Sequence, residues 1–576
     1  MAAPRTPPAP TPRILEEIAF QKAAVARLRR EIRDVDRNSR RRYIREFHDD
    51  FSGYESPASW DELVIACYRS DVVYVGDYHA LPGSQEFAAR LIDAVAERSR
   101  RVVLGLEMVY GRHQQVLERY MGGAIGEEEF LRAVRYDLDW GYDWPSFRRL
   151  FETARRRGIP VHGLDCGPRT GFRSIRRRDR YAAARLAGIV EASPGARVMV
   201  LFGESHLART HLPLQLSRLL KRRGLERRCL IVLQNLEEIA WAMAGDGLAG
   251  IEVARLAPDV YCHFNASPIV KYEAYRHVIE AWKEEDDQTG AVDLTSTIHG
   301  VIDMILRFLH VDKFTHGVRP RGRPRTLLVD LYPEVYSELE AAELQAVLEG
   351  GGLGPDGIAE VADHVGRSGS CYVPRLNAVF IGALNLAHAG EEAAHFVNLA
   401  LKGEIEDAAP RAMARHDLFY TGVLEEALGF FGSKLVDPSR NHFFETDFYQ
   451  YYRKAPEVIR ANTAYEPEEF NAIIDFILLH KKFEQSYERY PDVPEAILEG
   501  IRSDHRRANI LVHELGYFLG QQIHDAYRAG LIDRREILDL FRSSFLVTGS
   551  SLGRYLDLTR QVAPVLRGGL SPAGGG

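Results

Sequence analysis

The stretch VVYVGDYH, residues 72–79, decides the fold because an apolar run ends there in a glycine, a carboxylate and, two residues later, a histidine. The same layout recurs in VMVLFGESH, residues 198–206. A continuous apolar run is typical of a buried parallel strand, and open α/β sheets build their sites just beyond the carboxyl ends of such strands. The two copies therefore predict two pairs of an acid and an imidazole that face one crevice.

Strand and helix signals alternate from about residue 60 to residue 283. Alternation of this kind indicates right-handed crossovers and a mostly parallel sheet flanked by helices. We therefore expect an α/β domain over residues 55–283. The predicted strands are residues 71–76, 101–107, 159–165, 197–203 and 228–233, and predicted helices include 85–98, 144–157 and 178–191.

The character of the chain changes after a charged, strand-free patch at residues 283–290, which is typical of a linker. Helical periodicity dominates from there on and strand signals are weak, so we expect a mostly α-helical second domain. A chain of 576 residues is also too long for one ordinary core. The remaining expected parts are a disordered proline-rich tail at 1–13, an amphipathic helical arm at 14–50, the helical domain at 293–565 and a flexible tail at 566–576.

The amphipathic arm carries an a/d pattern of apolar residues about three heptads long. Its members are Ile14, Ile18, Val25, Leu28, Ile32 and Val35. The pattern favours a helix that packs on its own protein, and a homodimer formed through this helix is the alternative.

Composition and charge indicate which classes of binding partner to expect. A net charge of −7 argues against a general nucleic-acid binder, and no uncharged apolar stretch reaches the length of a membrane span. No secretory signal is visible, and the 5 cysteines are scattered singly, as expected for free thiols in a reducing compartment. We expect a cytoplasmic protein that binds a small-molecule ligand and neither nucleic acid nor membrane.

Polar side chains follow four of the predicted strands. Two imidazoles among several carboxylates suit a metal ion held by nitrogen and oxygen ligands, or a metal-free hydrolysis in which a histidine deprotonates water. The alternative is that these polar residues have only a structural role, as helix caps and as salt bridges in loops. The candidate metal ligands are Asp77, His79, Glu107, Asp165, Glu204 and His206, and the candidate catalytic residues are His79, Glu107 and His206.

Four segments together resemble the ChaN-like haem-binding-uptake domains of the Tiki superfamily over roughly residues 60–262. They read DVVYVGDYHALPGSQ, VVLGLEMVYGRHQQVLERYMGG, DWGYDWPSFRRLFETARRRGIPVHGLDC and VMVLFGESHL. Relatives in this superfamily include Tiki-type metal-dependent peptidases and erythromycin-esterase-like hydrolases. The resemblance implies a site built from the two GxxH loops and the Glu107 strand. This chain departs from the family in having Asp77 where glutamate is usual.

The resemblance implies two functions. One is binding of haem or of a divalent metal ion (Mn, Fe or Zn) in the crevice between the GxxH loops, with Tyr78, Tyr110 and His113 as further candidates for contacting the cofactor. The alternative is a hydrolase in which His79 or His206 is the general base. Glu107 would then orient the base or bind a metal, and Asp165 would support it. A third possibility is a regulatory or scaffolding protein without activity.

Two further groups of residues are ambiguous. Arginines at 169, 173, 176, 177, 178 and 180 could hold an anionic ligand or form a solvated helix start. In the helical region, His388, Glu391 or Glu392, and His395 share one helix face. The spacing of Glu392 and His395 is the one used by di-metal helical bundles. A second metal site at His388, Glu392 and His395 is therefore a candidate, and a stripe of polar residues that satisfy one another is the alternative.

Overall fold

The computed structural model describes residues 11–35, 42–99, 101–167, 169, 172–284, 293–316, 326–337, 339–382, 384–403, 415–442, 449–463, 465–489 and 505–567. Residues 1–10 of the predicted tail at 1–13, and residues 568–576 of the predicted tail at 566–576, lie outside the described residues. The described ends of both segments are helical from Pro12 and up to Arg567. The chain divides into two compact units, one of residues 1–10 and 21–282 and the other of residues 11–20 and 283–576. We call them the α/β unit and the helical unit.

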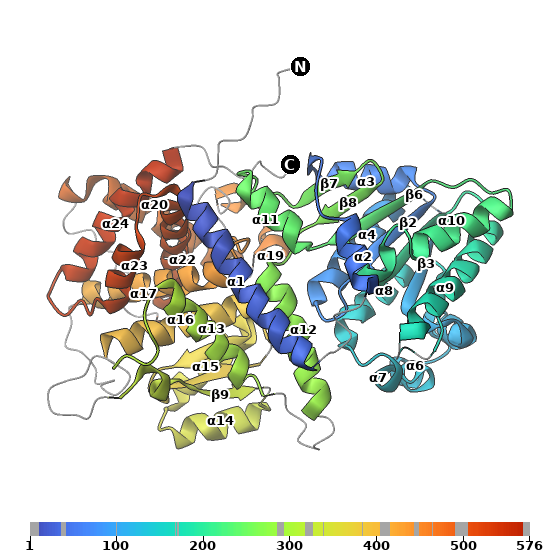
Figure 1. Ribbon diagram of the computed structural model, residues 1–576. Coiled ribbons are helices and arrows are strands. Elements are labelled where there is room, and N and C mark those ends of the chain that lie inside the picture. The colour runs from blue at the N-terminus through green and yellow to red at the C-terminus, as the bar shows by residue number, and fades with distance from the viewer. Residues whose placement is uncertain are drawn as a thin grey trace. The chain divides into compact units, whose positions relative to one another are not determined.

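The α/β unit is built on an eight-stranded sheet in the order β1-β7-β8-β6-β2-β5-β3-β4 (Figure 1). Every strand from β8 to β4 in this order lies parallel to its neighbours, and only the β1–β7 and β7–β8 pairs are antiparallel. The mostly parallel sheet predicted from the sequence is confirmed. The strands are β1 (Ser56–Ala58), β2 (Val72–Asp77), β3 (Val102–Tyr110), β4 (Val161–Asp165), β5 (Arg197–Gly203), β6 (Cys229–Gln234), β7 (Val253–Ala257) and β8 (Val260–His263).

Helices cover both faces of this sheet, which is why the strands are apolar on both sides. Successive residues of a strand point to opposite faces. Val73 and Val75 belong to one apolar cluster together with residues of α3 (Trp60–Arg69), α4 (Pro82–Arg98) and α8 (Trp144–Arg157). Val72 and Tyr74 belong to a second cluster with residues of α9 (Phe172–Ala192), α10 (Leu212–Arg222) and α11 (Glu237–Gly245). The unit therefore has three layers.

The helices of the α/β unit follow the strand-helix alternation expected from the sequence. They are α2 (Arg42–Asp50), α3 (Trp60–Arg69), α4 (Pro82–Arg98), η2 (Gly111–His113), α5 (Gln114–Met121), α6 (Glu127–Val134), α7 (Tyr136–Asp139), α8 (Trp144–Arg157), α9 (Phe172–Ala192), η3 (Glu204–Leu207), α10 (Leu212–Arg222), α11 (Glu237–Gly245) and α12 (Pro268–Glu284).

Three strands of this sheet were not predicted. β1, β7 and β8 contain three to five residues each, and a run that short has no periodicity that separates a strand from a turn. β3 also continues to Tyr110, three residues beyond the predicted end. The register between β3 and β4 shifts between Leu106 and Tyr110, and this irregularity lets the pairing continue past Glu107.

The amphipathic arm forms α1 (Pro12–Val35), of which residues 12–20 belong to the helical unit. Within the α/β unit its apolar stripe is buried at Val25, Leu28 and Ile32. Gln21 accepts a hydrogen bond from Nε1 of Trp241 on α11 at 3.2 Å. This part of the arm therefore packs on its own unit, and a homodimer through it stays a prediction.

The helical unit contains a small sheet that was not predicted. β9 (Glu334–Ser337), β10 (Ser370–Val373) and β11 (Ala378–Ile381) pair in the order β10-β11-β9. Each strand has four residues, too few to show a period against the surrounding helices. The other elements are α13 (Thr295–Phe308), η5 (Leu328–Leu331), α14 (Ala341–Gly350), α15 (Pro355–Ser368), α16 (Leu386–Lys402), α17 (Arg415–Val436), α19 (Pro456–Asn462), α20 (Pro467–Ser486), η6 (Tyr487–Arg489), α22 (His505–Ala529), α23 (Arg534–Arg542) and α24 (Ser550–Arg567).

The helices were searched for a segment able to cross a bilayer. Within the described parts of the chain, none combines the length and the apolar character that a span needs. All 5 cysteines are free of disulfides.

Gly163 on β4 provides a test of the β3–β4 packing. A Cβ there would lie 2.8 Å from the carbonyl oxygen of Val109 and 2.9 Å from that of Tyr110, both backbone atoms. Gly163→Ala should therefore lower the free energy of unfolding of the α/β unit by about 1 to 3 kcal/mol. Denaturant unfolding followed by tryptophan fluorescence measures this selectively, because all 5 tryptophans lie between residues 60 and 282.

The matched control is Gly188, in the interior of α9, where an added Cβ would meet nothing within 4 Å. Gly188→Ala should leave the unit unchanged or stabilise it by up to about 1 kcal/mol, because alanine favours a helix. Equal stability of Gly163→Ala and the parent protein would contradict the close approach of β3 and β4.

Candidate functional site

The strand order brings the two GxxH corners next to Glu107. β2 and β5 are neighbours in the sheet, with Asp77 paired to Gly203, and β5 also pairs with β3. His79 follows the end of β2, and His206 lies in η3 directly after β5. Glu107 lies inside β3, three residues before its end. Parallel strands end at the same edge of a sheet, so these side chains meet there.

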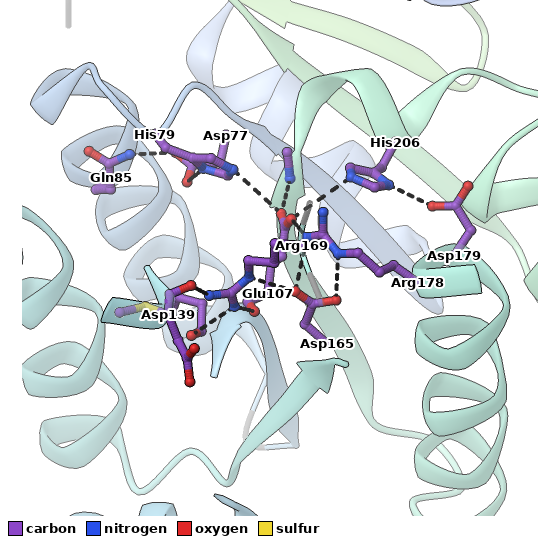
Figure 2. A network of polar contacts seen from close by, with 12 residues as sticks. Asp77, His79, Gln85, Glu107, Asp139, Asp165, Arg169, Arg178, Asp179 and His206 are labelled. Atoms are coloured by element: carbon purple, nitrogen blue, oxygen red, sulfur yellow. Dashed lines mark hydrogen bonds and ion pairs between the residues drawn. The ribbon is translucent and has the colours of Figure 1, made fainter. Parts of the chain in front are cut away.

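Glu107 is the centre of the group, and Figure 2 shows the two imidazoles on either side of it. Its side chain is 4% exposed. Oε2 accepts a hydrogen bond from the Gly203 amide at 2.5 Å, and Oε1 accepts one from Nη2 of Arg178. His79 Nε2 lies 3.7 Å from Oε2, and His206 Nε2 lies 3.9 Å from Oε1. One buried carboxylate therefore faces two imidazole nitrogens.

The other nitrogen of His79 is held by the aspartate of its own loop. Nδ1 lies 2.7 Å from Oδ2 of Asp77, whose Oδ1 accepts a hydrogen bond from Gln85 Nε2 at 2.5 Å. A carboxylate only accepts hydrogen bonds, so in the neutral imidazole the proton lies on Nδ1 and the lone pair on Nε2. Burial lowers the pKa of His79, but the carboxylates of Asp77 and Glu107 outweigh burial and raise that pKa above its ordinary value.

His206 is oriented in the same way by a residue from α9. Its Nδ1 lies 2.6 Å from Oδ1 of Asp179. The hydroxyl of Tyr43 donates to the other oxygen of Asp179 at 2.8 Å and lies 3.1 Å from His206 Nδ1. The Tyr43 ring stacks on His211 with a centroid separation of 3.6 Å. The lone pair of His206 Nε2 is thereby directed toward Glu107.

Arg178 supplies the positive charge that this buried site requires. Its guanidinium donates to both oxygens of Asp165 at 2.8 and 2.9 Å, and also to Glu107. Arg169 adds a further hydrogen bond to Asp165 at 2.9 Å. Burial raises the pKa of Glu107, but Arg178 and the two imidazoles outweigh burial and hold that pKa well below its usual range. Asp165, a predicted metal ligand, is fully occupied by the two arginines.

Aromatic rings surround His79 on its exposed side. The Trp140 ring lies 4.4 Å from the His79 ring between centroids, and Tyr142 lies 5.1 Å from it. The side chain of His79 is 19% exposed, whereas that of His206 is 6% exposed. His79 is therefore the imidazole that a ligand reaches from solvent. Trp144 instead packs against Tyr136 in the core, at 5.2 Å between ring centroids.

The predicted cofactor contacts do not join this group. Arg169 lies between the rings of Tyr110 and Trp140, 4.3 and 4.5 Å from their centroids, and so separates Tyr110 from His79. The His113 ring stacks with Tyr110 at 6.2 Å between centroids. Tyr110 and His113 therefore lie together, apart from the two imidazoles.

Glu204 and Tyr78 instead belong to a second polar group, which forms around Lys271. Lys271 on α12 donates to both oxygens of Glu204, at 2.9 and 3.1 Å, and its ammonium lies 4.7 Å from the centroid of the Tyr78 ring. Glu237 lies 4.0 Å from the same ammonium. Of the six predicted metal ligands, Asp77, His79, Glu107 and His206 converge, Asp165 supports them through Arg178, and Glu204 pairs with Lys271.

Sequence reasoning missed two residues that build the site, Asp179 and Tyr43, and one residue of the second polar group, Lys271. Asp179 directly follows Arg178 at the start of an arginine-rich helix, and a single acid among cations was the only available signal for it. Tyr43 comes from α2, 163 residues before His206, and Lys271 comes from α12. Neither Tyr43 nor Lys271 stands in a motif, so no sequence pattern pointed to them.

Arg178 can be tested by removing its charge. Arg178→Met should lower the free energy of unfolding of the α/β unit by about 3 to 5 kcal/mol, because two buried carboxylates lose their cation. Arg177→Met is the matched control, since the Arg177 side chain is exposed, and it should change stability little. Tryptophan fluorescence during denaturation gives both values. Equal losses for the two variants would show that the buried ion pairs do not support the site.

The chain is similar to one protein family and to two solved structures. Residues 63–188 match the family described as haem-binding uptake, Tiki superfamily, ChaN. The structure of ChaN from Campylobacter jejuni, reported with cofacial heme binding, is 14% identical, with 32% of this chain and 89% of that chain covered and a TM-score of 0.26. The type III effector HopBA1 is 15% identical, with 32% and 88% covered and a TM-score of 0.26. No curated protein matches the chain.

The family match contains most of the site. Residues 63–188 include His79, Glu107 and Asp179 and end before the second corner at His206. The resemblance stated from the sequence is confirmed over residues 63–188, which match the ChaN family model of the Tiki superfamily.

Proposed function

We propose that the α/β unit binds an iron-related ligand, either haem or a divalent metal ion, through His79, His206 and Glu107. The observation that carries this proposal is the matched orientation of the two imidazoles. Each has its Nδ1 bound by an aspartate and its Nε2 directed at the same carboxylate. An aspartate in this place fixes the tautomer and the ring orientation of a metal-binding histidine and makes it a stronger ligand.

Each imidazole nitrogen lies at a distance from Glu107 that two ligands of one ion can have, and the two contacts use different oxygens of that carboxylate. Metal–ligand bonds of about 2.1 Å place two ligand atoms of one ion roughly 3.0 to 4.2 Å apart. The separations of Glu107 from His79 Nε2 and His206 Nε2 are 3.7 and 3.9 Å. Nitrogen and oxygen ligands of this kind suit Mn, Fe or Zn.

Haem fits the same residues through its iron. Histidine is a common axial ligand, and Trp140 and Tyr142 place aromatic surface beside the exposed edge of His79. Tyr78, Tyr110 and His113 are separated from this group, so the axial ligand would be an imidazole of the pair and not one of these three residues.

A hydrolase is the second candidate, and the position of Arg178 favours it. The guanidinium already neutralises Glu107, which weakens the attraction of that carboxylate for a metal cation. His79 would then remove a proton from water through Nε2, and Asp77 would stabilise the imidazolium that forms. Of the two imidazoles, His79 is the more exposed and is therefore the general base in this version.

The direct test uses the purified full-length protein, incubated separately with haemin, Fe²⁺, Mn²⁺ and Zn²⁺. The proposal expects a Soret band or bound metal in the parent protein, and loss of the Soret band or of about one equivalent of that metal in His79→Ala, His206→Ala and the double variant. His113→Ala is the control, because its ring is apart from the pair, and it should bind as the parent does. A double variant that binds as much haem or metal as the parent does, or loss in the control alone, would contradict the assignment.

The aspartates give a finer test. Asp77→Asn and Asp179→Asn should each weaken metal affinity roughly 10- to 100-fold, because the amide no longer fixes the imidazole tautomer. Asp137→Asn, an exposed change elsewhere in the unit, should have no effect. Titration of each variant with Zn²⁺ measures the affinities. Unchanged affinity in both site variants would remove the role of the aspartates.

The same preparations separate the other functions. Hydrolysis of model esters or amides that disappears in His79→Ala, with no Soret band and no metal that the double variant loses, would select the hydrolase. Absence of all three signals would select the regulatory or scaffolding role. The cytoplasmic location and the absence of nucleic-acid and membrane partners stay predictions.

A further inference from the structure

A second cluster of ligand-type residues lies inside the helical unit. Glu391 on α16, Glu426 on α17 and His513 on α22 each offer one ligand atom, and these atoms all lie within 4.8 Å of one another. The Glu391 side chain is 4% exposed, whereas those of Glu426 and His513 are 24% and 30% exposed. Three helices thus contribute one ligand each to a group that solvent reaches from one side.

Glycines bring the three helices close together at this point. A Cβ on Gly429 of α17 would lie 2.7 Å from Nε2 of His395 on α16 and 3.1 Å from Cγ of Glu391. A Cβ on Gly516 of α22 would collide with the side chain of Glu426. Only a residue without a side chain leaves room for these ligands, so the packing of the helices is fitted to the cluster.

The two carboxylates carry like charges in a partly dry environment. Glu391 is held by Tyr517, whose hydroxyl donates to Oε1 at 2.5 Å, and by Arg440, whose Nη1 donates to Oε2 at 2.9 Å. Glu426 Oε2 lies 3.3 Å from Nδ1 of His513. Two carboxylates this close repel each other unless a cation lies nearby. Arg440 supplies positive charge on the Glu391 side, and the basic groups that face Glu426 are the imidazoles of His513 and His395.

Two further imidazoles face the carboxylates without hydrogen bonding to them. His395 Nε2 lies 3.9 Å from Glu426 Oε1, and His388 Nδ1 lies 3.9 Å from Glu391 Oε2. Within the part of the chain that the structure describes, neither ring makes a hydrogen bond. These separations fall within the roughly 3.0 to 4.2 Å expected between two ligands of one ion.

We propose that Glu391, Glu426 and His513 bind a divalent transition-metal ion in the helical unit, with His395 as a further ligand. The mixed nitrogen and oxygen set suits Zn²⁺, Co²⁺, Mn²⁺ or Fe²⁺. This set of ligands differs from His388, Glu392 and His395, the set expected from spacing along one helix. Glu392 turns away from the cluster, where it accepts a hydrogen bond from the Tyr372 amide at 2.7 Å.

The test uses the full-length chain carrying His79→Ala and His206→Ala, so that the α/β site does not contribute. This parent is stripped with a chelator and then titrated with Zn²⁺ and Co²⁺. It should bind about one equivalent and give the visible absorption bands of Co²⁺ with nitrogen and oxygen ligands. Failure of the α/β proposal would leave this result unaffected, because its ligands are already absent.

Substitutions then assign the ligands. Glu426→Gln and His513→Gln should each abolish the Co²⁺ bands or weaken binding at least tenfold. Gly429→Ala should weaken binding without removing a ligand, because its methyl group displaces His395. Glu425→Gln is the matched control, since Glu425 is the adjacent residue and pairs with Lys402 at 2.7 Å, and it should bind as the parent does.

Folding is checked for each variant by far-ultraviolet circular dichroism. A parent that binds neither ion would overturn the proposal and identify the cluster as an ion-pair network. Glu426→Gln and His513→Gln are each judged only if they keep the circular dichroism spectrum of the parent. Metal binding retained in such a variant would also overturn the proposal. An equal loss of metal binding in Glu425→Gln would do the same.

Discussion

The pairing of Arg178 with Glu107 and Asp165 is the constraint on which the α/β site depends. Strand ends place both carboxylates in the interior, where an ionised acid is costly unless a cation accompanies it. The guanidinium of Arg178 serves both acids and connects α9 to two neighbouring strands. Because Asp179 follows Arg178 on the same helix, this anchoring also places an aspartate against His206. The position of α9 therefore both neutralises the two buried acids through Arg178 and orients the His206 imidazole through Asp179.

Symmetry between the two corners explains what the site can do. His79 and His206 come from different strands, yet each is bound through Nδ1 by an aspartate and presents Nε2 to Glu107. The aspartates differ in origin: Asp77 lies in the same loop as its histidine, and Asp179 comes from a helix. The two proposed roles, ligand binding and proton transfer, both require this orientation, so the geometry is compatible with either of them, and the charge of Arg178 influences which is favoured.

The helical unit shows why spacing along one helix is an incomplete guide to a site. A helix face includes residues three and four positions apart, so spacing alone left Glu391 and Glu392 as alternatives. Packing against α17 and α22 decides between them, because Glu391 meets the ligand-type residues of those helices and Glu392 meets the Tyr372 amide. Small residues such as Gly429 permit that packing. The residues that form this cluster therefore come from three segments that are far apart in sequence.

The sequence by itself determined the five strands β2 to β6, the two corners at residues 72–79 and 198–206, and the presence of Glu107 beside them. These features are local, because an apolar run followed by glycine and polar residues specifies a buried strand and its end without reference to the rest of the chain. Only the tertiary structure decided where each polar side chain points. Glu204 turned to Lys271, and Tyr43 reached His206 from 163 residues away. Such pairings depend on which helices pack over the sheet, which no local pattern encodes.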